Sequence, residues 1–178
     1  IRDYCASRGL GDVYKRQGVA SQDVLLFSDT IDGNIAFGRS DMPEEEVYKY
    51  ATLAAADDFI RKTSDGYDTI IGERGVGLSG GQKQRISLAR ALAVKPSVLI
   101  LDDTTSAVDM ETEKYIQNSL KNLDFECTKI IIAQRISSTK NADKIIILNN
   151  GSIEDIGTHE ELIAKHGYYR EVYDLQTN

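Results

Sequence analysis

The sequence has few cysteines and no long hydrophobic run, and both shortages limit what the protein can be. A membrane-spanning helix needs roughly 20 consecutive apolar residues, whereas the longest apolar runs here are short, as at residues 98–101 and 130–133. Any association with a membrane is therefore expected to come through another segment or polypeptide. Cys5 and Cys127 lie far apart and without metal-ligand spacing, which favours a reducing compartment over a disulfide framework.

A cluster of basic residues is also missing. The formal net charge of -7 is spread along the chain, and basic residues occur at most as pairs such as Lys15 and Arg16. Since a nucleic-acid surface needs a concentrated basic patch, we expect no nucleic-acid partner. The chain has 178 residues, of which 41% are hydrophobic, so it can bury one sizeable core.

The chain divides into three parts on sequence alone. Residues 1–17 carry several basic residues and little periodicity, so they resemble an expression scar or a sequence-assembly artefact fused to a domain. An ordinary flexible arm is the alternative, and in either case we exclude them from the fold. Residues 18–95 are expected to include a small helical unit, and residues 96–178 an alternation of strands and helices.

Helix signals are specific in the second part. Asp41 as a cap, Pro43 in the first turn and the acids at 44–46 precede an apolar series with helical spacing, which predicts a helix there. Ser79 can cap a further helix, which is expected to end near residues 95–96 (Lys-Pro).

The third part changes its pattern. Residues 98–101, 129–133 and 144–148 are nearly continuous apolar runs, with a helix expected at 110–123 between the first two. This alternation is typical of a buried parallel sheet with crossover helices. Residues 149–152 (Asn-Asn-Gly-Ser) predict a tight hairpin turn, and two helices are expected to follow.

Two motifs combine polar groups with positions that suit a phosphate and a metal. Residues 79–82 open the helix that Ser79 caps, so bare amides and the positive end of the helix dipole face whatever lies beyond. Asp102 and Asp103 follow an apolar strand at the carboxyl edge of the expected sheet, where open α/β sheets bind ligands. Taken singly, the first motif could be a common turn and the second a helix cap or a solvated loop.

Together, these motifs resemble the ATP-binding domain of ABC transporters. Residues 78–82 resemble the signature motif, residues 98–102 the Walker B strand and residues 106–109 the D-loop. Gln22 matches the glutamine of the Q-loop, and Gln134 stands where the family has a switch histidine. The resemblance implies an α/β fold, the C-terminal part of a RecA-like P-loop NTPase core with the ABC helical subdomain.

The resemblance also implies ligands and roles. ATP and Mg²⁺ would be the ligands, with Asp102 holding magnesium-bound water and Gln22 acting as a ligand and sensor near the metal. The signature residues that would bind the γ-phosphate of ATP are Ser79, Gly80, Gly81 and Gln82.

In this family the domains pair head to tail, so one chain contributes to two composite sites. The signature would act on the nucleotide of the opposite domain, and Asp109 would lie at the interface between the two domains. Glu73 belongs to a segment that resembles the one that meets the coupling helices of the membrane domain in ABC exporters.

Two departures from the family pattern fall in the same composite site. Asp103 stands where the family has a glutamate as general base, and its carboxylate is about 1.5 Å shorter in reach. A misplacement of about 1 Å can cost on the order of 100-fold in rate. Gln134 can form hydrogen bonds but cannot carry a positive charge beside the γ-phosphate. The pattern resembles heterodimeric exporters, in which one site hydrolyses ATP and the other is degenerate.

A third departure is an absence, because no Gly-x-x-x-x-Gly-Lys-Ser/Thr loop occurs in the sequence. We therefore interpret the chain as a fragment of an ATP hydrolase that works at the cytoplasmic face of the cell membrane, with a natural pseudo-domain as the alternative. Its expected partners are a second ABC ATPase domain, from a different subunit, and the transmembrane domain of an exporter. A soluble ABC ATPase without a membrane domain and a non-catalytic interaction module are the alternatives.

Overall fold

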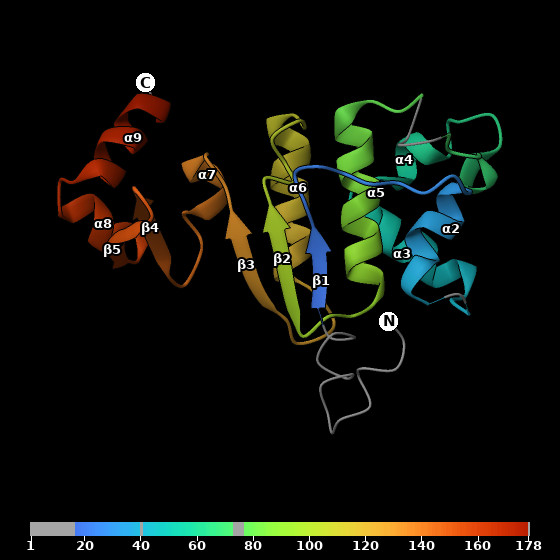
Figure 1. The fold of residues 1–178 in the computed structure, drawn as a ribbon, viewed down its shortest axis with the longest axis horizontal. Coiled ribbons are helices and arrows are strands. Elements are labelled where there is room, and N and C mark those ends of the chain that lie inside the picture. Colours follow the sequence, from blue (N-terminus) through green and yellow to red (C-terminus); the bar gives the residue numbers. More distant parts are fainter. Residues whose placement is uncertain (1–16, 40, 73–76, 178) are drawn as a thin grey trace. The chain divides into compact units, whose positions relative to one another are not determined.

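The computed structural model describes residues 17–39, 41–72 and 77–177, and the chain divides into two compact units after Ile132 (Figure 1). Each unit is described by itself. The first contains β1 (Gln17–Ala20), α2 (Ile31–Ile35), α3 (Glu44–Leu53), α4 (Asp57–Ile60), α5 (Gly80–Ala93), β2 (Val98–Asp102), α6 (Met110–Lys121) and β3 (Thr128–Ile132), with short 3₁₀ helices at Ala36–Gly38 and Gly66–Asp68. The second contains α7 (Ile136–Thr139), β4 (Ile145–Asn149), β5 (Ser152–Gly157), α8 (His159–Ala164) and α9 (Tyr168–Thr177).

Strands β1, β2 and β3 form a parallel sheet in that order. Val19 pairs with Ile100, and Ile100 pairs with Ile130, so these three residues lie in one row across the sheet. The sequence predicted β2 and β3 from their apolar runs but did not identify β1 as a strand, and the exclusion of residues 1–17 from the fold is wrong at Gln17, which pairs with Val98. This strand is only four residues long, which is too short for a periodic pattern to stand out.

Helices cover one face of this sheet. Chain connections from β1 to β2 and from β2 to β3 step across the sheet in the same direction. Since parallel crossovers are almost always right-handed, the helices within both connections belong on the same face. Accordingly Leu99 and Leu101 of β2 are buried in one core with Ile86 of α5 and Ile116 of α6.

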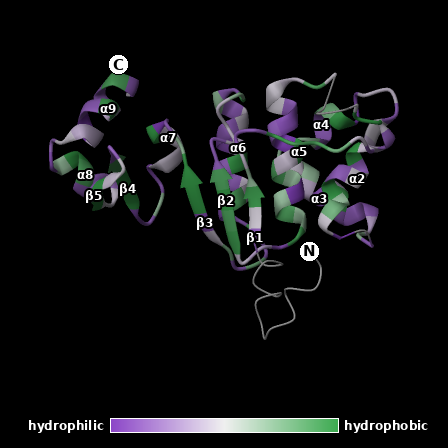
Figure 2. Cartoon of the chain, viewed as in Figure 1, coloured by the Kyte–Doolittle hydropathy of each residue, from purple (hydrophilic) through white to green (hydrophobic). Residues whose placement is uncertain are grey.

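The opposite face of the sheet is apolar but exposed. Val19, Ile130 and Ile132 retain 54%, 47% and 52% of their accessible surface. In Figure 2 strands β2 and β3 are coloured as mostly hydrophobic. Parallel sheets are normally covered on both faces, so this surface is unusual for the fold.

The helical region between β1 and α5 largely follows its sequence signals. Thr30 caps α2, and its hydroxyl accepts a hydrogen bond from the Gly33 amide. The expected cap of α3 was wrong by two residues, because Pro43 and not Asp41 occupies the N-cap position. Proline fixes its own φ and needs no hydrogen-bond donor there, so the helix can start directly after it.

In the second unit, β4 and β5 form an antiparallel hairpin. The predicted turn is confirmed, with Asn150 and Gly151 at φ values of 47° and 76°, as a two-residue hairpin requires. The expectation that residues 144–148 join the parallel sheet is wrong for the described residues, because β4 pairs with β5 instead. An apolar run of this length is compatible with either kind of sheet.

None of the helices in the described ranges has the length and apolar character needed to cross a bilayer.

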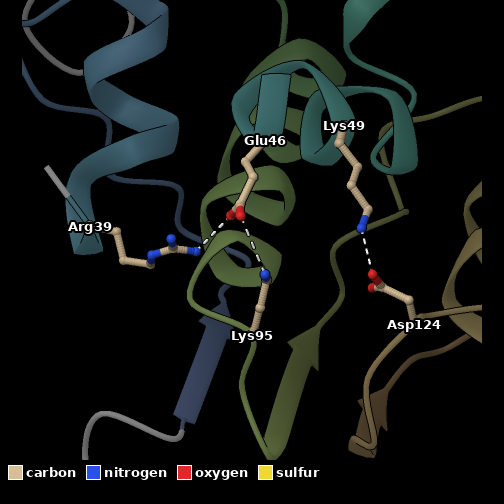
Figure 3. Close-up of polar contacts among 5 residues, drawn as sticks. All are labelled: Arg39, Glu46, Lys49, Lys95 and Asp124. Carbon is tan, nitrogen blue, oxygen red and sulfur yellow. Dashed lines mark hydrogen bonds and ion pairs between the residues drawn. The ribbon is translucent and has the colours of Figure 1, made fainter. Parts of the chain in front are cut away.

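Two sets of ion pairs tie α3 to the ends of α5 and α6 (Figure 3). Glu46 of α3 accepts a hydrogen bond from Arg39 Nη1 at 2.7 Å and lies 3.4 Å from Nζ of Lys95, which follows α5. Lys49, also on α3, lies 2.6 Å from the carboxylate of Asp124, which follows α6. The hydrogen bond from Arg39, together with the charges of Arg39 and Lys95, lowers the pKa of Glu46 below its ordinary value of 4.5.

We expect Glu46→Gln to lower the Tm at neutral pH and to lose this effect in acid. A carboxylate whose folded-state pKa is lowered stabilises the protein above its unfolded pKa, and this contribution disappears as the pH falls through the folded value. Thermal melts of both proteins from pH 7 to below pH 4.5 should therefore converge. Glu45→Gln, an exposed neighbour on the same turn, is the control and should change the Tm little. A Tm difference for Glu46→Gln that stays constant into acid would contradict the assignment.

Candidate functional site

The start of α5 is an N-terminal cap with two reciprocal hydrogen bonds. The Gln82 amide donates to Ser79 Oγ at 3.2 Å, and the Ser79 amide donates to Gln82 Oε1 at 2.8 Å. Gly80 and Gly81 occupy the first two helical positions, whose amides have no partner within an α-helix. The predicted cap is confirmed. The helix therefore presents free amides and the positive end of its dipole, which suit an anion such as phosphate.

The first turn of α5 packs directly on the loop between β2 and α6, residues 103–109. A Cβ atom on Gly81 would lie 2.6 Å from the backbone oxygen of Ala107, whereas one on Gly80 would lie 3.7 Å from the nearest atom, Ala107 Cβ. The second position of the helix therefore has no room for a side chain. This close contact brings the residues that resemble the signature motif next to the residues that resemble the D-loop.

Gln84, which sequence reasoning did not select, joins the same two segments. Its side chain is buried, and its Nε2 donates to the Asp103 carbonyl oxygen and to Ser106 Oγ, each at 3.3 Å. Its Oε1 accepts a hydrogen bond from the Ala107 amide at 3.2 Å. The sequence carries no signal for this role, because a glutamine on a helix can face solvent equally well.

Asp102 and Gln22 lie at the same edge of the parallel sheet. Asp102 is the last residue of β2, and Gln22 follows the end of β1 by two residues, with Ala20 opposite Leu101 in the register. Gln22 is exposed and Asp102 is partly exposed. The structure thus places a carboxylate and a side-chain amide, both suitable oxygen ligands for Mg²⁺, at the ends of adjacent strands.

Asp103 has an unusual backbone conformation, with φ of 50°. Its amide donates to the Ile132 carbonyl oxygen at 2.9 Å, and its own carbonyl oxygen accepts hydrogen bonds from Ser106 Oγ and Gln84. Left-handed conformations are rare outside glycine, and short polar side chains such as Asp and Asn tolerate them best. The Ser106 amide also donates to the Asp103 carbonyl oxygen, at 3.4 Å, so four hydrogen bonds hold the main chain of this candidate base.

Asp109 is exposed and caps α6. Its carboxylate accepts hydrogen bonds from the Thr112 amide at 2.9 Å and the Thr112 hydroxyl at 2.7 Å. These bonds, above all the one from the amide, lower the pKa of Asp109. Asp109 thus caps α6 and lies at the surface of the first unit. Its place at a domain interface stays a prediction. Glu73, the other residue expected at an interface, lies outside the described residues.

Gln134 belongs to the second unit, where it is exposed. Its carbonyl oxygen accepts a hydrogen bond from Gln176 Nε2 at 3.0 Å, while Gln176 Oε1 accepts one from the Ile136 amide at 2.8 Å. The side chain of Gln176, on α9, therefore fixes the main chain around Gln134. Sequence reasoning did not identify Gln176, because a glutamine in the last turn of a terminal helix carries no particular signal.

Among the described residues, no group of three or more His, Cys, Asp or Glu side chains is arranged to hold a metal ion. This finding is compatible with a magnesium site at Asp102, because Mg²⁺ is usually bound through one or two carboxylates together with substrate phosphates. The donor types of Asp102 and Gln22 fit that cation.

The segment after Gln22 is also anchored to α5, through Arg90. Its guanidinium donates to the carbonyl oxygens of Leu25 and Asn34, both at 2.8 Å, and lies 4.9 Å from the ring centroid of Phe27. Asn34 is fully buried and bonds in turn to the amide and the carbonyl of Phe27. Burial lowers the pKa of Arg90. The sequence offered one signal, an arginine within the apolar run at residues 88–92.

Comparison with known proteins agrees with the resemblance to ABC transporters that the sequence motifs indicated. The family model described as "ABC transporter" matches residues 7–106. An ABC transporter ATP-binding protein of Bacillus subtilis (strain 168), YknU, is 55% identical over 159 residues, which are 89% of this chain and 27% of that protein. A Staphylococcus aureus (strain NCTC 8325 / PS 47) protein, named as a candidate multidrug export ATP-binding/permease protein, is 49% identical over 93% of this chain and 29% of its own length.

A solved structure gives a further match. The structure of a bacterial Atm1-family ABC exporter with ATP bound superposes with a TM-score of 0.88 at 40% identity, over 92% of this chain and 29% of that chain. The α/β fold expected from the sequence, part of a P-loop NTPase core with the ABC helical subdomain, is confirmed by this match. The chain spans less than a third of the length of each of these relatives.

We expect Gly81→Ala and Gly80→Ala to have opposite effects on stability. Alanine favours helix over glycine by about 1 kcal/mol, so Gly80→Ala should be neutral or stabilising. At Gly81 the new Cβ would meet the Ala107 carbonyl at 2.6 Å, and overpacking of this kind costs about 1–3 kcal/mol. Urea unfolding of the two variants measures the difference, and equal stability of the two would show that α5 and the 103–109 loop are not in close contact.

Proposed function

We propose, since the chain belongs to the ABC transporter family, that it is part of the ATP-binding domain of an exporter in which ATP hydrolysis drives transport across a membrane. Two relatives support the exporter assignment, the S. aureus protein with its multidrug export name and the Atm1-family exporter that binds ATP. On this proposal the transmembrane segments belong to the rest of the longer protein or to another subunit. The ATP-binding domain would lie on the cytoplasmic face of the membrane.

One observation carries the proposal, namely the contact between the start of α5 and the 103–109 loop at the carboxyl edge of a parallel sheet. Gly81 touches Ala107, and Gln84 bonds to the same loop. Free helix amides suit a phosphate, and a carboxylate at the end of a strand suits a magnesium ion that is itself bound to phosphate oxygens. The chain thus offers a group that suits a phosphate and a group that suits a magnesium ion, and this combination supports the proposal.

Each group is proposed to act on a different nucleotide. In a head-to-tail pair, Ser79, Gly80 and Gly81 donate to the γ-phosphate of the ATP held by the partner, with Gln82 closing the cap behind them. Asp102 and Gln22 act on the magnesium ion of the ATP held by the longer protein's own phosphate loop. Asp109 lies at the interface of the pair, and Glu73 faces the transmembrane domain.

We further propose that the pair is a heterodimer with one degenerate site. Asp103 and Gln134 would serve the site that this chain shares with the partner's signature motif. An aspartate reaches less far than a glutamate, and a neutral amide cannot place a positive charge beside the γ-phosphate. That site would mainly hold ATP, while the partner would supply the working base and the histidine of the other site.

The exposed face of the parallel sheet supports a longer polypeptide. Its apolar row includes Val19 and Ile130, which are 54% and 47% exposed, and parallel sheets bury both faces. A phosphate loop comes as a unit of strand, loop and helix. We propose that such a unit, from the part of the protein that the chain does not span, covers this face and brings the loop to the carboxyl edge near Asp102. The described region then comprises the helical subdomain, within residues 18–95, and part of the core, which includes β1 as well as elements within residues 96–178.

The 178-residue chain is expected to bind ATP weakly or not at all in the presence of magnesium, because its sequence contains no phosphate loop whose amides and lysine could hold the β- and γ-phosphates. Calorimetry measures this affinity. A polypeptide that includes the preceding phosphate loop is the matched comparison and should bind ATP much more tightly. Tight, magnesium-dependent binding by the chain itself would refute this assignment of its parts.

In the full-length pair, Ser79→Arg in this chain should remove most ATP turnover, while Asp103→Asn should have a much smaller effect. The arginine would occupy the space beside the helix amides that meet the partner's γ-phosphate. Asp103→Asn keeps a residue that tolerates the left-handed φ of 50° and removes only the carboxylate. We expect a loss of roughly a hundredfold or more for the first and a few-fold for the second, at about 1.4 kcal/mol per factor of ten.

Ser79→Ala separates the two consequences of losing the serine. It removes the cap, which costs about 1 kcal/mol of stability, without adding bulk, so its turnover should stay well above that of Ser79→Arg. Melting curves of all three variants verify that each is folded at the assay temperature. Equal, severe losses in well-folded Ser79→Arg and Asp103→Asn would mean that Asp103 is a working base and that the degenerate-site assignment is wrong.

A further inference from the structure

We infer that Gln84 is a positioning residue that locks together the two half-sites contributed by this chain, the signature end of α5 and the loop that begins at Asp103. The inference rests on the proposed function for its consequence in catalysis. Its structural part rests on the contacts of Gln84 alone, and the two parts are tested separately below.

Both the oxygen and the NH₂ group of the Gln84 side chain form hydrogen bonds. The residue is 6% exposed, and a buried amide is costly unless it is hydrogen-bonded. Its carbonyl oxygen accepts from the Ala107 amide, and its NH₂ group donates to the Asp103 carbonyl oxygen and to Ser106 Oγ. The loop thus receives one acceptor and one donor from a single side chain.

Only a side chain that both accepts and donates can satisfy these partners. Glutamate has nearly the same shape and could still accept from Ala107, but a carboxylate cannot donate to the Asp103 carbonyl oxygen. Methionine fills a similar volume and can do neither strongly. These three side chains therefore separate the acceptor contact, the donor contact and simple packing.

The donor contact bears on the candidate base directly. Asp103 has φ of 50°, so the direction of its side chain depends on a backbone conformation that costs roughly 1–2 kcal/mol for most L-residues. Gln84 and Ser106 both bond to its carbonyl oxygen. Without Gln84 this carbonyl is held by Ser106 alone, through its hydroxyl and its amide, so the backbone of Asp103 is less constrained.

The acceptor contact connects this position to the other nucleotide. Ala107 donates to Gln84 and at the same time touches Gly81, where a Cβ would come within 2.6 Å of its carbonyl oxygen. A shift of the loop must therefore move Gly81, or open a gap beside it. Since Ser79, Gly80 and Gly81 are proposed to bind the partner's ATP, Gln84 links the geometry of the two composite sites.

The structural part is tested by amide hydrogen exchange in the 178-residue chain. In Gln84→Met the Ala107 amide should exchange about fivefold faster or more, because it loses a buried acceptor worth about one net hydrogen bond. In Gln84→Glu the acceptor remains, so the Ala107 amide should stay protected. Matched controls are Asn122→Leu and Asn122→Asp, since that exposed amide bonds only within its own helix, to Asn118, among the contacts described.

The catalytic part is tested in the full-length pair that carries the same variants in this chain. Gln84→Met removes the acceptor contact that holds Ala107 against Gly81 at the site of turnover, so it should lower kcat by about tenfold or more, with KM for ATP changed less than about twofold. Gln84→Glu keeps that contact and removes only the donor to Asp103, so its loss of kcat should be a few-fold at most, like that of Asp103→Asn. The Asn122 variants should leave kcat unchanged.

Four outcomes decide the matter. Unchanged exchange at Ala107 in folded Gln84→Met would overturn the structural link. Altered exchange with full turnover in both Gln84 variants would overturn the positioning role while leaving the proposed function intact. If the parent pair shows no ATP turnover, the proposed function fails, whereas the exchange measurement still reads the contacts of Gln84. Should Gln84→Met fail to fold, Gln84→Glu carries the test, because loss of Ala107 protection, or a loss of kcat well beyond a few-fold, in that variant contradicts the inference by itself.

Discussion

The burial of α5 against the parallel sheet is the interaction on which the rest of the first unit depends. Isoleucine and leucine side chains of this helix share one core with β2 and α6, so the helix axis is fixed by apolar packing along its length. Its polar side chains can then hold neighbouring loops in fixed positions. Ser79 and Gln82 form the cap at one end, Gln84 reaches the 103–109 loop, and Arg90 reaches the segment after Gln22. The candidate site residues are therefore positioned by their contacts with one helix, and not by each loop independently.

The contacts of Arg90 differ from those of Gln84 because Arg90 is charged. A guanidinium carries its charge at any ordinary pH, and burying it is costly unless acceptors surround it. Here those acceptors are backbone carbonyls and the Asn34 amide, with the rings of Phe27 and Phe37 stacked on each other beside the guanidinium. Removing Arg90 would take one donor from each of three acceptors, the carbonyl oxygens of Leu25 and Asn34 and the side-chain oxygen of Asn34. The segment from Leu25 to Asn34 is therefore held in place mainly by its contacts with α5, and less by its own short helix.

The sequence predicted those features that depend on local chemistry. Ser79 followed by glycines and Gln82 specifies a capped helix start by itself, and an apolar strand that ends in two aspartates specifies β2 and the edge of its sheet. Features that depend on long-range pairing were missed. β1 is recognisable only by its partner β2, and the apolar run at residues 144–148 does not by itself distinguish a hairpin from a parallel sheet, although the predicted turn at residues 149–152 favoured the hairpin. Gln84 was missed for a related reason, because a glutamine on a helix gives no sign of whether it faces solvent or a buried loop.

Asp103 suits the left-handed backbone of its loop, but its side chain is shorter than that of a glutamate. In the left-handed conformation that the loop requires, a short side chain that can bond to nearby main-chain groups is the least strained choice apart from glycine. An aspartate satisfies the backbone but gives up the reach that a glutamate would have toward an attacking water. Since the site that contains Asp103 is proposed to hold ATP rather than to hydrolyse it, that reach is not needed there. A well-held loop would then serve this chain better than a strong base, because the same loop also supports Gly81 at the site where turnover is proposed to occur.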